Sequence, residues 1–161
     1  MSENVFVIAP ANQTDLTDVL LLMRDLAEFE GYLPDFAVTL DALERLYLQQ
    51  RVFGILVAKH KDSGSTENGR VAGILVYFFQ PFTYDLTPWL IVKELFVSEE
   101  FRGQGVGEAL MLEARNVCKA QGGSRMKWEV LTQNTAAQAF YKQLGASVEE
   151  NWRTMSLPLV R

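Results

Sequence analysis

The stretch that most constrains the fold is "LFVSEEFRGQGVGEALMLEA", Leu95 to Ala114, because three glycines stand where a helix should begin. An apolar run precedes the glycines and helical spacing follows them, which predicts a strand, a turn and a helix. Each glycine costs a helix about 0.8–1.0 kcal/mol relative to alanine. Gly103, Gly105 and Gly107 therefore serve something other than helix stability.

The glycines suit the binding of an anion at the start of this helix. The first N–H groups of a helix have no partner inside it, and they lie at the positive end of its dipole. Glycine removes the Cβ that would cover these groups and permits backbone angles that turn successive N–H groups toward one point. Arg102 adds a positive charge beside them. Residues 102–107 therefore predict a pyrophosphate site.

The spacing excludes two common phosphate-binding motifs. A dinucleotide fingerprint, Gly-x-Gly-x-x-Gly, fails because its third glycine would fall on Glu108 or Leu110. A Walker A motif fails because the chain has no Gly-Lys-Ser/Thr. The remaining pattern is Arg-x-x-Gly-x-Gly, late in a short chain.

The other segments predict one α/β (α+β) domain over residues 1–161 with a mixed sheet. Turn residues, apolar periodicity and β-branched runs separate the elements. We expect strands at 6–11, 52–59, 70–79, 89–97, 125–132 and 152–159, with a hairpin loop at 60–69. We expect four helices: one that Thr14 caps, one over 39–50, one from the glycines to about Gln121, and one from Asn134 to Gly145.

Composition narrows the functional classes. The net charge of -5 argues against a nucleic-acid surface, which needs a basic face, and is compatible with cationic small molecules. Single copies of histidine (His60) and cysteine (Cys118) exclude a multi-histidine or thiolate metal cluster, so we expect no metal. No run approaches the ~18 apolar residues of a membrane helix, and no signal-peptide start is visible. We therefore expect no membrane partner and a cytoplasmic location.

Two motifs in order resemble the GNAT superfamily of N-acetyltransferases. "RGQGVG" looks like the acetyl-CoA pyrophosphate loop of that superfamily, and "NTAAQAFYKQLGA" at 134–146 resembles its later segment, where an Asn begins a helix and a Tyr follows. The resemblance implies a mostly antiparallel, twisted sheet flanked by helices. "LAEFEGY", "FTYDLTPWLIVKELFV", "FYKQLGAS" and "EENWR" are similar to the diamine (spermidine/spermine-like) branch. That branch acetylates small primary amines in a ternary complex and usually forms a homodimer.

The resemblance also implies a set of site residues. Contacts to acetyl-CoA would come from Leu95, Phe96, Val97, Arg102, Gly103, Gln104, Gly105, Val106, Gly107, Glu108, Asn134, Thr135, Ala136, Ala137 and Tyr141. Contacts to the acceptor would come from Phe29, Glu30, Lys93, Lys127, Trp128, Glu129 and Glu150.

The expected chemistry assigns two catalytic residues. Glu94 could act as general base through a water, or could be a partly buried carboxylate that bonds to the backbone. Tyr141 is the candidate general acid, since a phenol is protonated at neutral pH, although its helix face also suits core packing. The fold resemblance makes the Val97 N–H the candidate donor to the thioester carbonyl.

The identity of the acceptor depends on Lys93, where the diamine branch tends to carry an acid. Strict alternation along a strand would place Lys93 and Glu94 on opposite faces. A lysine facing the acceptor would repel a polyamine and attract a carboxylate, which suggests an amino-acid-like amine; a lysine facing away would be merely solvated. Two other functions stay open: acetylation of a protein lysine or N-terminus, and a non-catalytic acyl-CoA sensor.

Overall fold

The computed structural model describes residues 5–61 and 69–160. It forms two compact units, one ending at Trp128 and one starting at Glu129. The strands of the first unit are β1 (Phe6–Pro10), β2 (Gly54–His60), β3 (Val71–Gln80), β4 (Trp89–Val97) and β5 (Arg125–Lys127). Its helices are α1 (Leu16–Glu30), α2 (Leu40–Leu43) and α3 (Val106–Ala120), with short turns η1 (Gln13–Asp15), η2 (Leu33–Asp35), η3 (Glu44–Gln49) and η4 (Glu99–Phe101).

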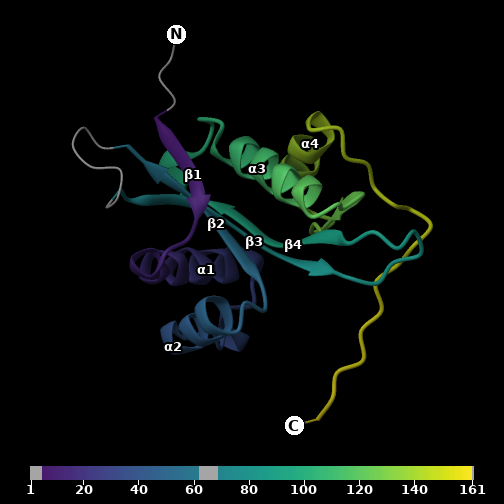
Figure 1. The fold of residues 1–161 in the computed structure, drawn as a ribbon, viewed down its shortest axis with the longest axis horizontal. Helices are drawn as coiled ribbons and strands as arrows, with labels where there is room; N and C mark the ends of the chain where they lie inside the picture. Colours follow the sequence, from purple (N-terminus) through teal and green to yellow (C-terminus); the bar gives the residue numbers. More distant parts are fainter. Residues whose placement is uncertain (1–4, 62–68, 161) are drawn as a thin grey trace. The chain divides into compact units, whose positions relative to one another are not determined.

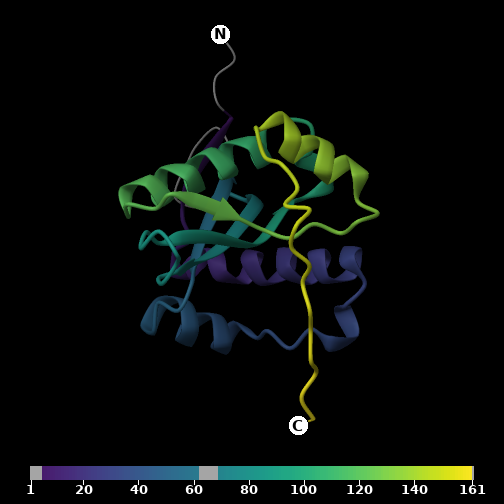
Figure 2. The ribbon, with the colours of Figure 1, turned by 90° about the vertical axis from the view of Figure 1, so that its right-hand side faces the viewer.

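The five strands form one sheet in the order β1-β2-β3-β4-β5. The pairs β1–β2, β2–β3 and β3–β4 are antiparallel, and β4–β5 is parallel. Helix α1 covers one face of this sheet, with α2 on the far side of α1, and α3 covers the other face (Figure 1; Figure 2). The α/β prediction with a mixed, mostly antiparallel sheet is confirmed.

Both faces of the sheet carry apolar cores. On the α1 face, the core includes Leu16, Val19, Leu22, Met23, Ile55, Val57, Ile74 and Val76. On the other face, α3 buries Val106, Leu110, Met111, Ala114 and Cys118. A Cβ at Gly73 would lie 3.1 Å from the Val106 side chain, so glycine in β3 lets the start of α3 approach the sheet closely. This packing fixes where α3 begins.

The start of α1 differs from the prediction. Neither Thr14 nor another side chain caps α1 itself, and Asn12 caps η1, the turn that leads directly into it. The Asn12 Oδ1 accepts the Asp15 N–H at 3.1 Å, and the Asp15 carboxylate accepts the Asn12 N–H at 2.9 Å. Asp15 also forms a buried ion pair with Lys59 of β2, with Nζ and Oδ1 2.8 Å apart. Asn and Thr are both good caps, and only the short turn before α1 decides between them.

Two further expected elements of the first unit are altered. The helix expected over 39–50 begins as predicted, since Thr39 Oγ1 accepts the Ala42 N–H at 3.1 Å, but α2 ends at Leu43 and continues as the π-helical turn η3. The strand expected over 125–132 is only Arg125–Lys127. Of the hairpin loop expected at 60–69, residues 62–68 lie outside the described residues.

The second unit holds α4 (Thr135–Gln143), which starts at the predicted residue. The closing strand predicted over 152–159 is wrong, since these residues have no regular secondary structure. A strand needs a paired neighbour for its N–H and C=O groups, and the described residues of this unit supply none. Across the described parts of the chain, the helices are too short or too polar to cross a membrane.

Candidate functional site

The start of α3 leaves its N–H groups bare. Gly105 occupies the capping position with φ +81° and no side-chain hydrogen bond, and Gly103 has φ +74°. Among residues 5–61 and 69–160, no acceptor binds the N–H groups of positions 103–108; the first N–H with an acceptor is that of Ala109, 3.0 Å from the Gly105 carbonyl. A Cβ at Gly103 or Gly105 would meet nothing within 4 Å, so space is open beside the loop. Bare donors next to open space fit a diphosphate.

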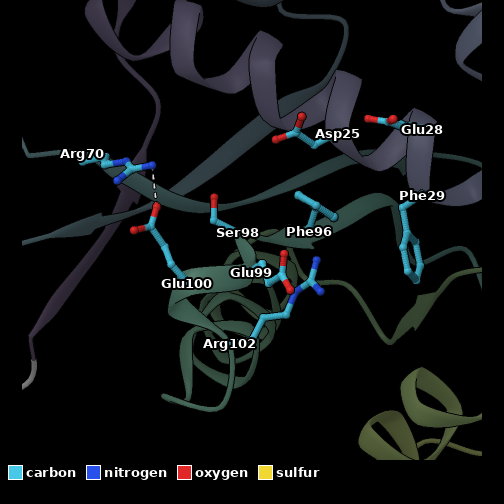
Figure 3. A pocket seen from close by; sticks show the side chains of 9 residues that line it. All are labelled: Asp25, Glu28, Phe29, Arg70, Phe96, Ser98, Glu99, Glu100 and Arg102. Carbon is cyan, nitrogen blue, oxygen red and sulfur yellow. Dashed lines mark ion pairs between the residues drawn. The ribbon is translucent and has the colours of Figure 1, made fainter.

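Arg102 is held beside this loop by the end of β4. Its Nε donates to the Val97 carbonyl at 3.0 Å, and its guanidinium carbon lies 5.4 Å from the centre of the Phe96 ring. The side chain is exposed, and its guanidinium points toward Phe96, as Figure 3 shows. The positive charge therefore lies where the strand ends and the glycine loop begins.

The end of β4 presents main-chain groups along an edge that β5 does not cover. The Ser98 N–H donates to the Ala72 carbonyl of the neighbouring strand at 2.9 Å. Because antiparallel residues alternate between bonded and non-bonded pairs, the N–H groups of Leu95 and Val97 point away from β3. Pairing with β5 stops at Ile91. Leu95 and Val97 are among the strand residues that the resemblance to the GNAT superfamily assigned to acetyl-CoA.

Glu94 lies on β4, and one of its carboxylate oxygens has no partner among the described residues. Its Oε2 is shielded from solvent and accepts no hydrogen bond from the described residues, so the backbone-bonded alternative gains no support at this oxygen. Burial raises the pKa of the Glu94 carboxyl; Lys93 opposes this rise, and Glu30 adds to it. A raised pKa brings a carboxylate closer to the pH at which a general base works best.

Tyr32 belongs to the same group of side chains, and the sequence analysis missed it. Burial, then the charges of Glu94 and Glu30, raise its pKa to about 12. Glu30 ends α1, Tyr32 follows it by two residues and Glu94 lies in the middle of β4, so these electrostatic effects link the end of α1 with β4. The only sequence signal was an aromatic residue one position after the glycine that ends α1.

A β-bulge interrupts β4 at Lys93. Val76 of β3 faces Glu94 and Tyr77 faces Val92, so Lys93 has no partner across the strand pair. The strict alternation that predicted opposite faces for Lys93 and Glu94 is therefore broken here. Lys93 is exposed, and its charge acts on the Glu94 carboxyl.

An open hollow of about 880 Å³ lies between the end of α1 and the end of β4. Its walls are Asp25, Glu28, Phe29, Arg70, Phe96, Ser98, Glu99, Glu100 and Arg102. In Figure 3, Asp25 and Glu28 lie on α1 across the hollow from Arg102, and Arg70 pairs with Glu100. Carboxylates on the α1 wall favour a cationic ligand at that end. Of the predicted acceptor contacts, Phe29 lines this hollow.

The remaining predicted residues of the first unit lie on and after β5. Lys127 places its Nζ 5.3 Å from the centre of the Trp89 ring, and Trp128 is half-buried. Among residues 5–61 and 69–160, no group of three or more His, Cys, Asp or Glu side chains could hold a metal ion.

The second unit holds the other predicted residues. Asn134 Oδ1 accepts the Ala137 N–H at 3.1 Å, and the half-buried Tyr141 lies on the same helix with its ring centre 5.2 Å from that of Phe140. Glu129 accepts the Thr154 hydroxyl at 2.9 Å. Thr135, Ala136 and Glu150 are exposed. Within this unit the structure supports the helix start at Asn134.

Comparisons with known proteins agree with these observations. The acetyltransferase (GNAT) family matches residues 23–146. A thialysine N-epsilon-acetyltransferase of Bos taurus is 29% identical over 142 residues, covering 87% of this chain and 83% of the relative. An L-ornithine N5-acetyltransferase of Arabidopsis thaliana is 29% identical over 87 residues, covering 54% of this chain and 38% of the relative.

Solved structures share the fold. An aminoglycoside acetyltransferase from an uncultured soil metagenomic sample superposes with a TM-score of 0.79 at 21% identity, covering 98% of this chain and 99% of that chain. An acetyltransferase of Trypanosoma brucei gives a TM-score of 0.74 at 22% identity, covering 96% and 99%. The chain belongs to the acetyltransferase (GNAT) family, closest to its diamine acetyltransferase branch, and is an acetyl-CoA-dependent N-acetyltransferase.

Proposed function

We propose that this enzyme acetylates the side-chain amine of a basic amino acid or of a similar small primary amine. The observation that carries the proposal is the shielded, unpartnered carboxylate oxygen of Glu94, near Glu30 and Tyr32. The relatives named for thialysine and ornithine support this class of acceptor.

Acetyl-CoA fits the bare donors of the first unit. The N–H groups of residues 103–108 and the Arg102 guanidinium would hold its diphosphate, and the open main chain at Leu95 and Val97 would hold the pantetheine arm. The Val97 N–H would donate to the thioester oxygen. Asn134, Thr135, Ala136, Ala137 and Tyr141 remain the predicted contacts from the second unit.

The residues divide the proton transfers between them. An alkylammonium of pKa ~10.4 must lose a proton before it can attack, and Glu94 would take that proton through a water. Bound acetyl-CoA supplies the thioester carbon: the amine nitrogen forms the C–N bond and releases its second proton to water, the C–S bond breaks, and CoA leaves as a thiolate. Tyr141 would donate its phenol proton to that thiolate and recover one from solvent.

A panel of amines tests the proposal directly. Thiol release from acetyl-CoA would be measured with ornithine, lysine, thialysine, putrescine, spermidine, an aminoglycoside and a lysine peptide, and mass spectrometry would locate the acetyl group. We expect turnover with small amines and modification at the side-chain nitrogen. Turnover with the peptide alone would show a protein acetyltransferase, and CoA binding without any turnover would show a sensor.

We also propose a cytoplasmic homodimer. The resemblance to the diamine branch supports a dimer, and so does the extended segment 152–160, in which Met155 is 93% and Leu157 83% exposed. Exposed apolar side chains such as these favour burial against the surface of a second protein chain. The buried free thiol of Cys118 supports a reducing compartment, and the net charge of -5 supports a small acceptor over nucleic acid. Light scattering of the full chain, and of a chain ending at Asn151, tests the dimer.

A further inference from the structure

The geometry of the β4 bulge points to Lys93 as the residue that selects acceptors carrying a carboxylate. This inference rests on the proposed function, because it assumes that the amine reacts beside Glu94. It adds that the positive charge of Lys93 recognises the carboxylate end of the acceptor. The acceptor class is then an amino acid with a side-chain amine, in preference to the diamine that lacks the carboxylate.

The charge of Lys93 is available to a ligand. No carboxylate among residues 5–61 and 69–160 lies within ion-pair distance of its Nζ, and the side chain is exposed. Lys59, by contrast, is buried and already paired with Asp15. An exposed lysine without a partner loses little solvation when a ligand carboxylate binds it.

At the bulge, Lys93 directly precedes Glu94 in the chain. Lys93 is the extra residue between Val92 and Glu94, and it has no cross-strand partner to fix its direction. Bulges commonly re-aim a side chain next to an active site. Because the two residues are adjacent in the chain, their charges interact, and Lys93 opposes the rise in the Glu94 pKa.

The site therefore has negative charge at Glu94 and Glu30 and positive charge at Lys93. Glu94 and Glu30 would attract the reacting ammonium, while Lys93 would attract a carboxylate separated from it by a short aliphatic chain. An amino acid such as ornithine carries both groups. Putrescine, which is ornithine without its carboxylate, would bring no negative group to Lys93.

A merely local role for Lys93 predicts a different result. If Lys93 only lowered the pKa of Glu94, its removal would shift the pH profile equally for every amine. Selection of a carboxylate instead changes the ratio between two acceptors that differ in that group alone. The ratio of kcat/KM for ornithine to that for putrescine, repeated with lysine and cadaverine, separates the two roles.

We expect the wild-type ratio to favour the amino acids by about tenfold or more, Lys93→Gln to lower it by about tenfold, and Lys93→Glu to reverse it. Lys119→Gln removes the same charge from an exposed position on α3 and should leave the ratio unchanged. If wild type and both Lys93 variants acetylate all four amines with the same amino-acid-to-diamine ratio of kcat/KM, the inference is wrong and the proposed function stands. Failure of the wild type to acetylate any of them would overturn the proposed function and the inference together.

Discussion

The starts of α1 and α3 solve the same problem in opposite ways. Each helix begins with N–H groups that lack partners inside the helix. In η1, the turn that leads directly into α1, the Asn12 and Asp15 side chains accept each other's N–H groups. At α3, glycines replace the capping side chains, and the N–H groups find no acceptor in the described part of the chain. The first arrangement serves the fold, and the second leaves donors for a ligand.

Two carboxylates, the buried Asp15 and the half-buried Glu94, repeat this contrast. Asp15 has its Lys59 partner 2.8 Å away, whereas Glu94 has a shielded oxygen without any hydrogen bond from the described residues. A buried charge without a partner costs stability, so its presence in a folded chain suggests that it serves the reaction. The α1 start should therefore govern unfolding, and the β4–α3 region should govern binding and turnover.

The largest expected effect follows from removing one member of the buried pair. Asp15→Ala leaves Lys59 buried and unpaired and removes one bond of the capping box at η1, which should cost about 3–5 kcal/mol in the free energy of unfolding. Urea unfolding measures this change. The Kd for acetyl-CoA, measured where the variant is fully folded, should be unchanged. A loss below about 1 kcal/mol would show that the α1 start does not govern stability.

Glu94→Gln should lower the activity of the enzyme and raise its thermal stability. Turnover should fall by about 10²-fold, because the general base is lost. The pKa of Glu94 is higher in the folded protein than in the unfolded chain. The stability that this group contributes is therefore complete at a pH below its unfolded-state pKa, and it is lost as the pH rises through its folded-state pKa. The variant should therefore unfold at a higher temperature than wild type at neutral pH, with the difference vanishing near pH 4.

The paired measurement can contradict this interpretation of Glu94. If the variant keeps normal turnover, Glu94 is not the base. If it also melts lower than wild type at neutral pH, the carboxylate stabilises the fold, and the contrast with Asp15 disappears. Thermal melts and thiol-release assays at several pH values decide both points on the same preparations.

A smaller effect should separate the glycine loop from an ordinary glycine turn. Gly105 and Gly122 have φ of +81° and +73°, and a Cβ at either position meets nothing within 4 Å. Alanine at either position should therefore cost a similar ~1 kcal/mol in stability. Only Gly105→Ala should weaken acetyl-CoA binding, by about tenfold, because its methyl group would occupy the ligand's space. Equal Kd values for the two variants would contradict a role for the loop.

Sequence patterns predicted what depends on local chemistry. The apolar face of α1, the run of β4, the glycines before α3 and the cap at Asn134 all follow from neighbouring residues. Tertiary pairing decided the rest. The bulge at Lys93 depends on the register with β3, and the missing strand at 152–159 depends on a neighbour that the sequence does not name. Tyr32 joins Glu94 only because the end of α1 packs near β4.

The most direct test follows the backbone amides themselves during an acetyl-CoA titration. In ¹⁵N-labelled protein, the amide resonances of residues 103–108 should shift most strongly, because their N–H groups acquire phosphate acceptors. The amides of Asn12 and Asp15 already have acceptors and should stay in place. If acetyl-CoA binds and shifts other amide resonances but leaves those of residues 103–108 unchanged, the glycine loop does not bind the diphosphate.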